Sequence, residues 1–295
     1  MADALQTPYK TYRTKSYPSI DPTQPSLSTA GKSAVLTGAG SGIGASIALS
    51  LARSGISHLA LIGRREHALL STKTSIHTIS PSTKVSIYPL SLTSSPSLAT
   101  ALASFASQTP SGKIDILIAN AGSLGPLSSL TSASSEEWWE TFEVNVLGNF
   151  NLIRAFLGHA VADASVVYIT SAIVHGPYFP NESAYCASKA GATKMFEYLH
   201  YEHPDLTVLA VQPGLIRDTG MLAGFEFVAE GLGMGVDELP WDDAALPGDF
   251  VVWAVSPEAR FLNGRFVWAN WDVDEMKGDK EGILANPRKF TLGLV

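Results

Sequence analysis

One short segment limits the possible folds of this chain more than any other, the glycine-rich run Thr37–Gly44. An apolar stretch, Ser33–Thr37, comes directly before it, and an apolar-periodic helical stretch from Gly44 follows. Glycines allow a tight turn and let the backbone approach a pyrophosphate, which the free N–H groups of a helix N-terminus then bind. Between a first strand and a first helix, this pattern predicts a dinucleotide-binding loop rather than an ordinary glycine-rich turn.

Short apolar runs alternate with helical stretches along the rest of the chain. We expect strands at Ser33–Thr37, His58–Ile62, Lys84–Pro89, Ile114–Ala119, Ser165–Thr170, Thr207–Gln212 and Phe266–Trp268. Helices are expected at Gly44–Ser54, Glu66–Ile79, Ser97–Ser107, Trp138–His159, Ala184–Glu202 and Asp243–Ser256. Most of the strands lack polar alternation, so both faces should be covered. The predicted fold class is α/β, a single-domain, Rossmann-type, doubly wound parallel sheet of about seven strands.

Two segments stand apart from this pattern. Residues 1–30 contain four prolines and little periodicity, so we expect an N-terminal extension that runs over the surface or is partly disordered. The main domain then covers 31–295. Between Arg217 and Arg260 there are nine acids, no lysine or arginine, and frequent glycines. This composition predicts a substrate lid around 218–242, and a solvated acidic surface loop is the alternative.

Charge and cysteine content limit which binding partners and which cellular compartment we expect for this protein. The 295-residue chain has a formal net charge of −7, which disfavours nucleic acids and anionic membranes as partners. No apolar run approaches the ~18–20 residues that span a bilayer, and the N-terminus has no apolar stretch like that of a secretory signal. Cys186 is the only cysteine, so an internal disulfide is impossible and a reducing, cytoplasmic location is expected. No metal site is predicted.

Two arginines follow the second predicted strand, at Arg64 and Arg65. In a dinucleotide-binding fold this position, roughly 20 residues beyond the glycine loop, lies at the adenosine ribose. An acid there binds the 2′-hydroxyl, whereas a guanidinium pairs with a 2′-phosphate. Arg64 is therefore the main candidate for a phosphate contact and Arg65 the second, unless both side chains simply face solvent.

Tyr185 and Lys189 are the main catalytic candidates. Their spacing of four residues on a helix places both side chains on one face. A nearby ammonium favours the phenolate and moves the tyrosine pKa from about 10 toward the range of a useful acid or base. Ser171 follows the strand Ser165–Thr170, and a hydroxyl at the carboxyl end of a strand can point into the ligand crevice.

Taken together, these motifs resemble the classical short-chain dehydrogenase/reductase family from about Lys32 to Asp272. The matching motifs are Thr37–Gly44, Asn120-Ala121-Gly122, Asn145 in Val-Asn-Val, Ser171, Tyr185 with Lys189, and Pro213-Gly214. The resemblance implies that Tyr185 is the general acid–base and that Ser171 polarises the substrate oxygen. It implies that Lys189 lowers the tyrosine pKa and holds the nicotinamide ribose, and that Asn145 supports a water-linked proton relay.

The resemblance also has implications for the cofactor and for assembly. It implies that Arg64 selects NADP(H), and that subunits pair around Trp138–His159 and Ala184–Glu202 as a homodimer or homotetramer. The residues expected to bind the cofactor are Gly38, Ser41, Gly42, Ile43, Gly44, Arg64, Asn120, Tyr185, Lys189, Pro213, Gly214 and Ile216.

The sequence departs from the family pattern at four positions. Ala119 stands where the family often has a first asparagine, and Ser91 stands where an adenine-contacting aspartate is usual. Ser41 replaces the basic residue that some NADPH enzymes carry in the glycine loop. Asp218 occupies the position of the family's threonine, with Thr219 following it, which puts the contact to the nicotinamide carboxamide in question.

We therefore expect an NADPH-dependent reductase or dehydrogenase that interconverts a carbonyl and an alcohol. The small-molecule substrate is expected to be a bulky, neutral or cationic ring compound resembling a specialised metabolite. A non-redox catalyst or a dinucleotide-sensing regulator on the same fold is the alternative, kept open by the displaced threonine. Candidates for lining the substrate pocket are His175, Tyr178 and Phe179, with Met221, Phe225 and Phe227 expected to reach the substrate from the lid.

Overall fold

A parallel sheet forms the centre of the molecule. The computed structural model describes residues 7–176, 178–217, 219–220, 224–226, 229, 233 and 235–293. Within them, seven strands pair in the order β3-β2-β1-β4-β5-β6-β7, and every pairing is parallel. The strands are β1 (Ser33–Thr37), β2 (His58–Gly63), β3 (Lys84–Pro89), β4 (Ile114–Ala119), β5 (Ala160–Ile169), β6 (Thr207–Gln212) and β7 (Arg265–Trp268). The predicted fold class is confirmed.

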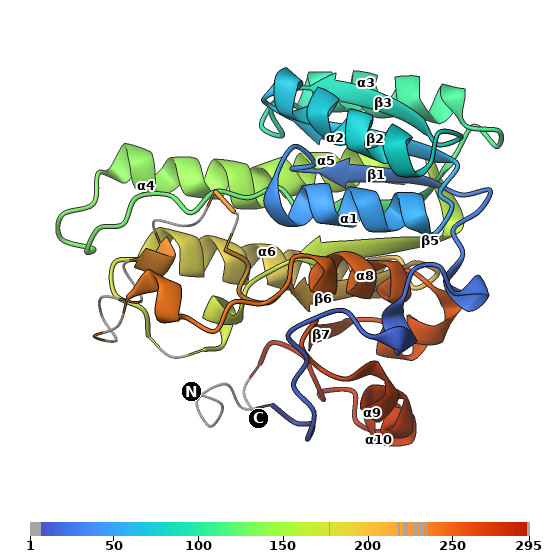
Figure 1. Ribbon diagram of the computed structural model, residues 1–295. Helices are drawn as coiled ribbons and strands as arrows, with labels where there is room; N and C mark the ends of the chain where they lie inside the picture. Colours follow the sequence, from blue (N-terminus) through green and yellow to red (C-terminus); the bar gives the residue numbers. More distant parts are fainter. Residues whose placement is uncertain are drawn as a thin grey trace.

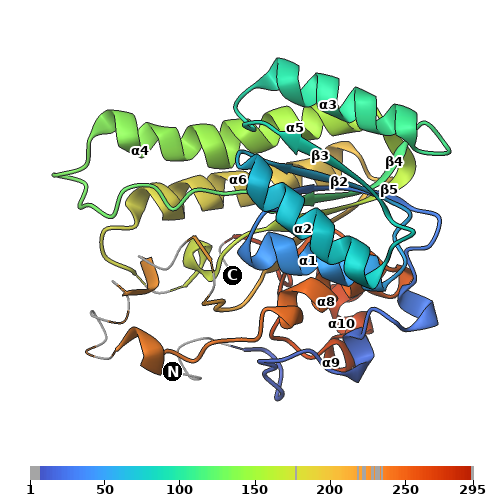
Figure 2. The same ribbon diagram turned by 45° about the horizontal axis from the view of Figure 1, so that its top comes forward.

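Helices cover both faces of this sheet (Figures 1 and 2). One layer contains α1 (Gly42–Arg53), α2 (Glu66–Ile79) and α8 (Ala245–Ala254). The other contains α3 (Ser95–Gln108), α4 (Ser135–Phe142), α5 (Gly148–Leu157) and α6 (Ser183–Glu202). Because both faces are covered, the inner strands are apolar throughout: all five residues of β1 are buried, while the edge strand β3 is partly exposed.

The strand order reverses between β1 and β4, which are neighbours in the sheet. Chain segments leave the carboxyl ends of these two strands toward opposite helix layers. A crevice therefore opens at this edge, where open α/β sheets bind their ligands.

The expected helix over Trp138–His159 is interrupted. It consists of α4, a π-helical turn η4 (Glu143–Leu147) and α5. A π turn inserts one extra residue per turn and often occurs at functional sites. The apolar spacing of the sequence continues across it, so periodicity alone does not reveal this feature. The expected strand Ser165–Thr170 begins earlier, at Ala160.

Residues 7–30 run over the surface, as expected of an N-terminal extension, but they also insert Tyr17, Ile20 and Leu27 into the core, which we did not expect. Two short 3₁₀ helices, η2 (Pro18–Ile20) and η3 (Pro25–Leu27), turn Ile20 and Leu27 inward, and both side chains are at most 1% exposed. Apolar side chains at such tight turns have no helical or strand period, which explains why the sequence pattern missed them. The segment contacts α8 and α9 (Val273–Gly278).

Figure 1 shows this segment beside the C-terminal part of the chain, and contacts with that part hold it in place. Tyr12 forms an isolated antiparallel bridge with Trp271, and Arg13 makes an ion pair with Asp272 at 2.6 Å. After α9 the chain continues into α10 (Lys280–Ala285), which packs near the 3₁₀ helix η7 (Pro257–Leu262).

Candidate active site

A cavity of about 1520 Å³ lies at the carboxyl ends of the strands. Its walls come from the segments that follow β1 to β6 and from the start of α6. This volume exceeds the roughly 300–1,000 Å³ of a typical small-ligand pocket. The space is therefore sufficient for a dinucleotide and a second molecule together.

The glycine loop after β1 has the geometry of a phosphate cradle. Gly38 and Gly42 have φ angles of +68° and +51°, a region that favours glycine. A Cβ atom at Gly44 would lie 2.2 Å from the carbonyl oxygen of Gly38, so no side chain fits there. Within the described residues, no side-chain hydrogen bond caps the start of α1, which leaves its N–H groups free for an anion. These residues fit a dinucleotide pyrophosphate.

Asn120 ties this loop to the neighbouring strand β4. Its Nδ2 atom donates to the carbonyl oxygen of Thr37 at 2.9 Å, and the Thr37 hydroxyl accepts from the backbone N–H of Asn120 at 3.0 Å. The Thr37 hydroxyl also accepts from the N–H of Ala121. Asn120 therefore shapes the floor of the cavity through the backbone of the glycine loop.

Two arginines lie at the end of the cavity beside β2. Arg64 and Arg65 are exposed and both line it. Arg65 donates from Nη2 to the hydroxyl of Ser41 at 3.1 Å, so the loop serine and an arginine meet at this end. In the described part of the chain, the Arg64 guanidinium has no hydrogen-bond or ion-pair partner. Its donors are available to an anionic ligand.

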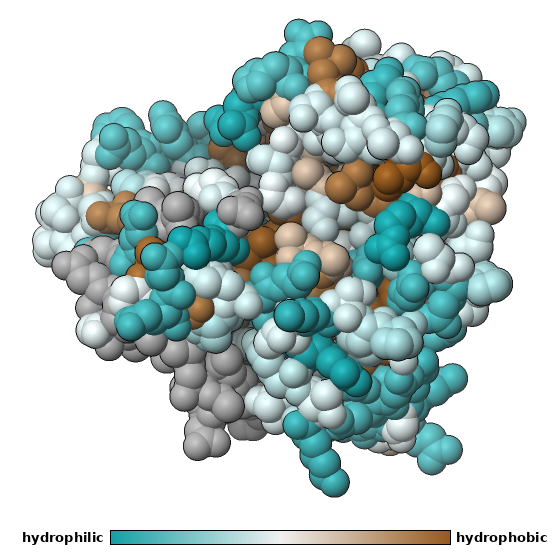
Figure 3. All heavy atoms as spheres, viewed as in Figure 1, coloured by the Kyte–Doolittle hydropathy of each residue, from teal (hydrophilic) through white to brown (hydrophobic). Residues whose placement is uncertain are grey.

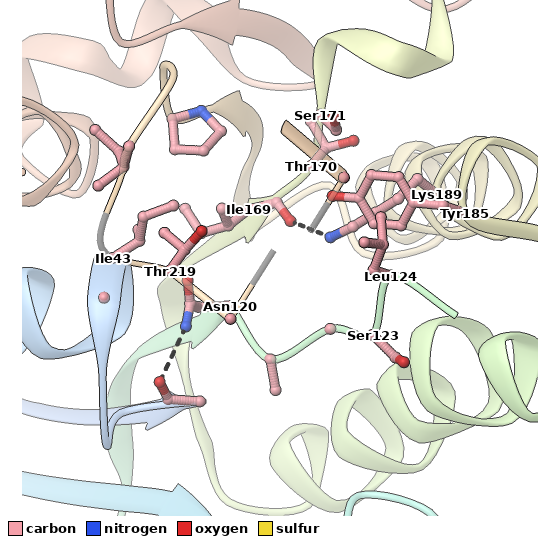
Figure 4. Close-up of a pocket in the computed structure, with 18 of the residues that line it drawn as sticks. Ile43, Asn120, Ser123, Leu124, Ile169, Thr170, Ser171, Tyr185, Lys189 and Thr219 are labelled. Atoms are coloured by element: carbon pink, nitrogen blue, oxygen red, sulfur yellow. Dashed lines mark hydrogen bonds between the residues drawn. The ribbon is translucent and has the colours of Figure 1, made fainter. Parts of the chain in front are cut away.

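Ser171, Tyr185 and Lys189 converge on one side of the cavity (Figure 4). Ser171 follows β5, whereas Tyr185 and Lys189 lie one turn apart on α6. The Lys189 ammonium donates to the carbonyl oxygen of Ile169 at 2.8 Å and lies 5.8 Å from the centre of the Tyr185 ring. The predicted catalytic side chains are thus brought together from two separate elements.

Burial controls the protonation of Lys189 and Tyr185. It lowers the pKa of Lys189 to about 7. Burial also raises the pKa of Tyr185 above its ordinary value of 10, while a hydrogen bond with Ser171 opposes this change. The resemblance implied a lowered tyrosine pKa, and in this structure the pKa is raised because desolvation of the phenolate is the largest effect. Tyr185 therefore carries its proton at neutral pH.

Asn145 lies behind the cavity wall rather than in it. It is 1% exposed and sits in the π-helical turn η4. Its Oδ1 accepts from the N–H of Ser123, its Nδ2 donates to the carbonyl of Ser123, both at 2.8 Å, and Nδ2 also donates to Ser188 at 2.9 Å. A Cβ at Gly122 would lie 3.3 Å from both Asn145 Oδ1 and Lys189 Nζ. Asn145 thus positions the loop that packs against Lys189.

The turn after β6 closes another side of the cavity. Pro213, Gly214 and Ile216 line it, and Gly214 has a φ angle of +95°. A Cβ at Gly214 would lie 2.6 Å from Asp242 Oδ2, which accepts from the N–H of Leu215 at 2.7 Å. The buried Asp242 therefore holds this turn in place.

Several predicted lid and pocket residues can be placed. Thr219 and Phe225 line the cavity, as do His175 and Phe179, whereas Tyr178 is 85% exposed and outside it. Asp218, Met221 and Phe227 lie outside the described residues.

Sequence reasoning missed some residues of the cavity wall. Glu182 precedes α6 and lines the cavity, as do Thr7, Tyr12 and Thr14 of the N-terminal segment. An acid three positions before Tyr185 was a visible signal for Glu182. Nothing in the sequence pattern indicated the N-terminal residues, because their placement depends on contacts with the distant C-terminal part.

Comparisons with known proteins agree with this fold and identify a family. The short chain dehydrogenase family matches residues 32–226. A short chain dehydrogenase/reductase of Claviceps purpurea is 32% identical over 297 residues, covering 99% of this chain and 96% of the relative. L-sorbose reductase from Gluconobacter frateurii, solved with NADPH and L-sorbose, has a TM-score of 0.73 at 22% identity, covering 82% of this chain and 96% of that one. Carveol dehydrogenase from Mycobacterium avium, solved with NAD, has a TM-score of 0.73 at 23% identity. The match covers 81% of this chain and 96% of that one.

The match to the short chain dehydrogenase family, on a doubly wound sheet, assigns the chain to the oxidoreductases that bind NAD or NADP. Within that class, the chain belongs to the short-chain dehydrogenase/reductase family, whose members act on small molecules. Among the described residues, no helix is long and apolar enough to span a membrane, and no cluster of metal-ligating side chains occurs.

Proposed function

We propose that this protein is an NADPH-dependent reductase that interconverts a carbonyl group and an alcohol on a bulky ring substrate. The observation that carries the proposal is the convergence of Ser171, Tyr185 and Lys189 in the cavity whose other end holds the phosphate cradle. When bound, the nicotinamide supplies or accepts the hydride.

The protein's own residues manage the proton. In reduction, Tyr185 donates its phenolic proton to the substrate oxygen, and the raised pKa of Tyr185 keeps that proton available. Ser171 donates a hydrogen bond to the same oxygen and orients it. Lys189, held by Ile169, places a positive charge near the phenol when protonated and so stabilises the phenolate that forms. Asn145 acts through the loop it positions, and we retain its predicted place in a proton relay.

The preference for NADPH rests on the arginines beside β2. Arg64 offers free guanidinium donors, and Arg65 already donates to the Ser41 hydroxyl of the glycine loop. Two cations at this position match a 2′-phosphate, and charge-assisted contacts of this kind are strong. The cavity residues expected to bind the cofactor are those named from the sequence, with Arg65 added.

The segment around 218–242 is proposed as the substrate lid. Phe225 and Leu239 of this segment line the cavity, and Phe225 packs edge-on against Trp241 with ring centres 5.3 Å apart. A lid built in this way adds apolar contacts to a ring substrate and excludes water from the reacting carbonyl.

A cytoplasmic homodimer or homotetramer completes the proposal. Hydrophilic residues predominate on the face shown in Figure 3, and hydrophobic side chains form small groups there. The α4–α5 unit, in contrast, exposes Trp139, Leu147 and Phe150, and α6 exposes Tyr198 and Tyr201, each at least 45%. Large exposed apolar side chains on neighbouring helices are typical of an interface.

A panel of cyclic and aromatic ketones, assayed by loss of NADPH absorbance, tests the function directly. We expect turnover of at least one bulky ketone and a slower rate with NADH. Calorimetric binding of NADPH without turnover of any ketone or alcohol would contradict the redox proposal and favour a non-redox role on the same fold.

A further inference from the structure

Glu182 is a buried carboxylic acid inside the catalytic cavity. It is the N-cap residue of α6, three positions before Tyr185, and only 7% of its surface is exposed. It lines the cavity together with Ser171 and Tyr185. Within the part of the chain that the structure describes, its carboxyl group has no hydrogen-bond or ion-pair partner. Although Glu182 occupies the N-cap position, its side chain makes no capping hydrogen bond to α6.

Such a group is costly for the fold. Burial removes water from the carboxyl group and raises the pKa of Glu182 to about 7. Buried acids are normally paired, because an unpaired one loses solvation without compensation. Since the Glu182 carboxyl group pairs with no described group and lines a ligand cavity, the missing partner is best supplied by the ligand.

The surroundings of Glu182 disfavour an anionic ligand. Desolvation is the main reason that the pKa values of Tyr185 and Cys186 on the same helix are raised, and the negative charge of Glu182 raises both further. On α4, Glu137 and Glu140 line the same cavity and add further negative charge. A substrate carboxylate or phosphate placed here would be repelled.

The described cations that line the cavity do not neutralise Glu182. Arg64 and Arg65 follow β2, which is separated from β5 by β1 and β4. Lys189 donates to Ile169. None of the three forms an ion pair with Glu182 in the described structure, so its charge is not neutralised from within the protein.

Gly224 and the Leu124 side chain lie close to the carboxyl group of Glu182. A Cβ atom at Gly224 would lie 3.6 Å from Glu182 Oε1 and 3.1 Å from the Leu124 side chain. The Gly224 backbone therefore passes close to the carboxyl group.

We infer that Glu182 is a specificity-determining residue that accepts a hydrogen bond from a donor group, a hydroxyl or an ammonium, on the ring substrate. The inference rests on the proposed function, because the reacting carbonyl must lie at Ser171 and Tyr185. Glu182 lies three positions before Tyr185, about one helical turn, so the donor group should lie close to the reacting carbonyl rather than at the far end of the substrate.

Matched ketones test this inference with the complete enzyme. The probes are 1-tetralone, 7-hydroxy-1-tetralone, 7-(aminomethyl)-1-tetralone and 7-carboxy-1-tetralone, whose substituents lie about one helical turn from the carbonyl oxygen. We expect kcat/KM for the hydroxyl or the ammonium compound to exceed that of 1-tetralone about tenfold or more, as a buried hydrogen bond to a charged group allows. The carboxylate compound should be the poorest substrate.

Two variants of Glu182 separate the possible donors. Glu182→Leu should bring the kcat/KM of the hydroxyl or ammonium ketone down to about that of 1-tetralone, a ratio of about one. Glu182→Gln keeps an acceptor, so it should retain a hydroxyl preference and lose an ammonium preference. Glu202→Gln, an exposed acid at the far end of α6, is the matched control and should keep the wild-type ratio. A preference for the carboxylate, or an unchanged ratio in Glu182→Leu, would overturn the inference.

Binding measured without turnover separates this inference from the proposed function. Calorimetry of each tetralone with the NADP⁺ complex of Tyr185→Phe should show affinities in the same order as the kcat/KM values. This order should disappear in the double variant that also carries Glu182→Leu. If no ketone is turned over but this order is found, the redox proposal fails and the role of Glu182 stands. If turnover occurs without the order, Glu182 is not the recognition residue.

Discussion

The carboxamide of Asn145 pairs with the backbone of Ser123 through two hydrogen bonds, one accepted and one donated, both at 2.8 Å. This arrangement resembles a short piece of strand pairing made by a side chain. It joins the π turn of η4 to the loop after β4, and it leaves Gly122 between Asn145 and Lys189. A single buried side chain thereby holds the wall against which the catalytic lysine packs.

Removing this pair should loosen the loop. Asn145→Ala leaves the N–H and C=O of Ser123 without partners, so we expect a loss of about 1–3 kcal/mol in the free energy of unfolding. Hydrogen exchange at the Ser123 amide should become faster, which distinguishes this role from a purely catalytic one. Asn286→Ala, at an exposed position, serves as the control. Unchanged exchange at Ser123 would show that the loop is held by other contacts.

Loss of the phenolic hydroxyl should abolish most of the activity. Tyr185→Phe removes the proton donor while keeping the ring, so turnover should fall roughly 100- to 10,000-fold. NADPH binding measured by calorimetry should stay close to wild type. An active Tyr185→Phe enzyme would mean that another group delivers the proton.

Cofactor choice should depend on Arg64. Replacing it with Asp removes a phosphate contact and introduces repulsion, so the preference for NADPH over NADH should fall by about 10- to 100-fold, equivalent to roughly 1.5–3 kcal/mol. The ratio of kcat/KM values with the two nucleotides is the measurement. Arg288→Asp makes the same charge change at an exposed site outside the cavity, and it should leave the ratio unaltered. Equal use of both nucleotides by the wild type would refute the assignment.

The stability of the cofactor-free protein should rise with pH above neutrality because of Lys189. The pKa of Lys189 falls from 10.5 to about 7 through burial, so between these values the unfolded chain binds a proton that the folded protein lacks. Stability from this group therefore increases with pH through that window and is constant below it. From pH 7.5 to 9.5 the gain should be about 2 kcal/mol. Urea unfolding of wild type and Lys189→Met measures it, since the difference between them isolates the lysine.

The N-terminal segment should contribute to global stability. Ile20 is fully buried, so Ile20→Ala should cost about 2–4 kcal/mol by creating a cavity in the core. Ile79→Ala makes the same change at a side chain that is 49% exposed, and it should cost less than about 1 kcal/mol. Similar melting temperatures for the two variants would mean that residues 7–30 are only loosely attached.

The sequence by itself determined the sheet, the glycine loop and the candidates Ser171, Tyr185 and Lys189. Apolar runs mark buried parallel strands locally, and the backbone requirements at Gly38 and Gly44 are properties of a few consecutive residues. Spacing alone also places Tyr185 and Lys189 on one helix face. These features depend on neighbours in the chain, so they can be read before the fold is known.

Only the tertiary structure decided what depends on burial and on distant contacts. The raised pKa values of Tyr185 and Glu182 come from desolvation, which depends on the elements packed around them. The inward packing of Ile20 requires α8 and α9. The π turn around Asn145 was not predicted, and in the folded protein it pairs with the backbone of Ser123 in the loop after β4. Solvation and pairing are properties of the assembled chain, because each group's free energy is set by what surrounds it in space.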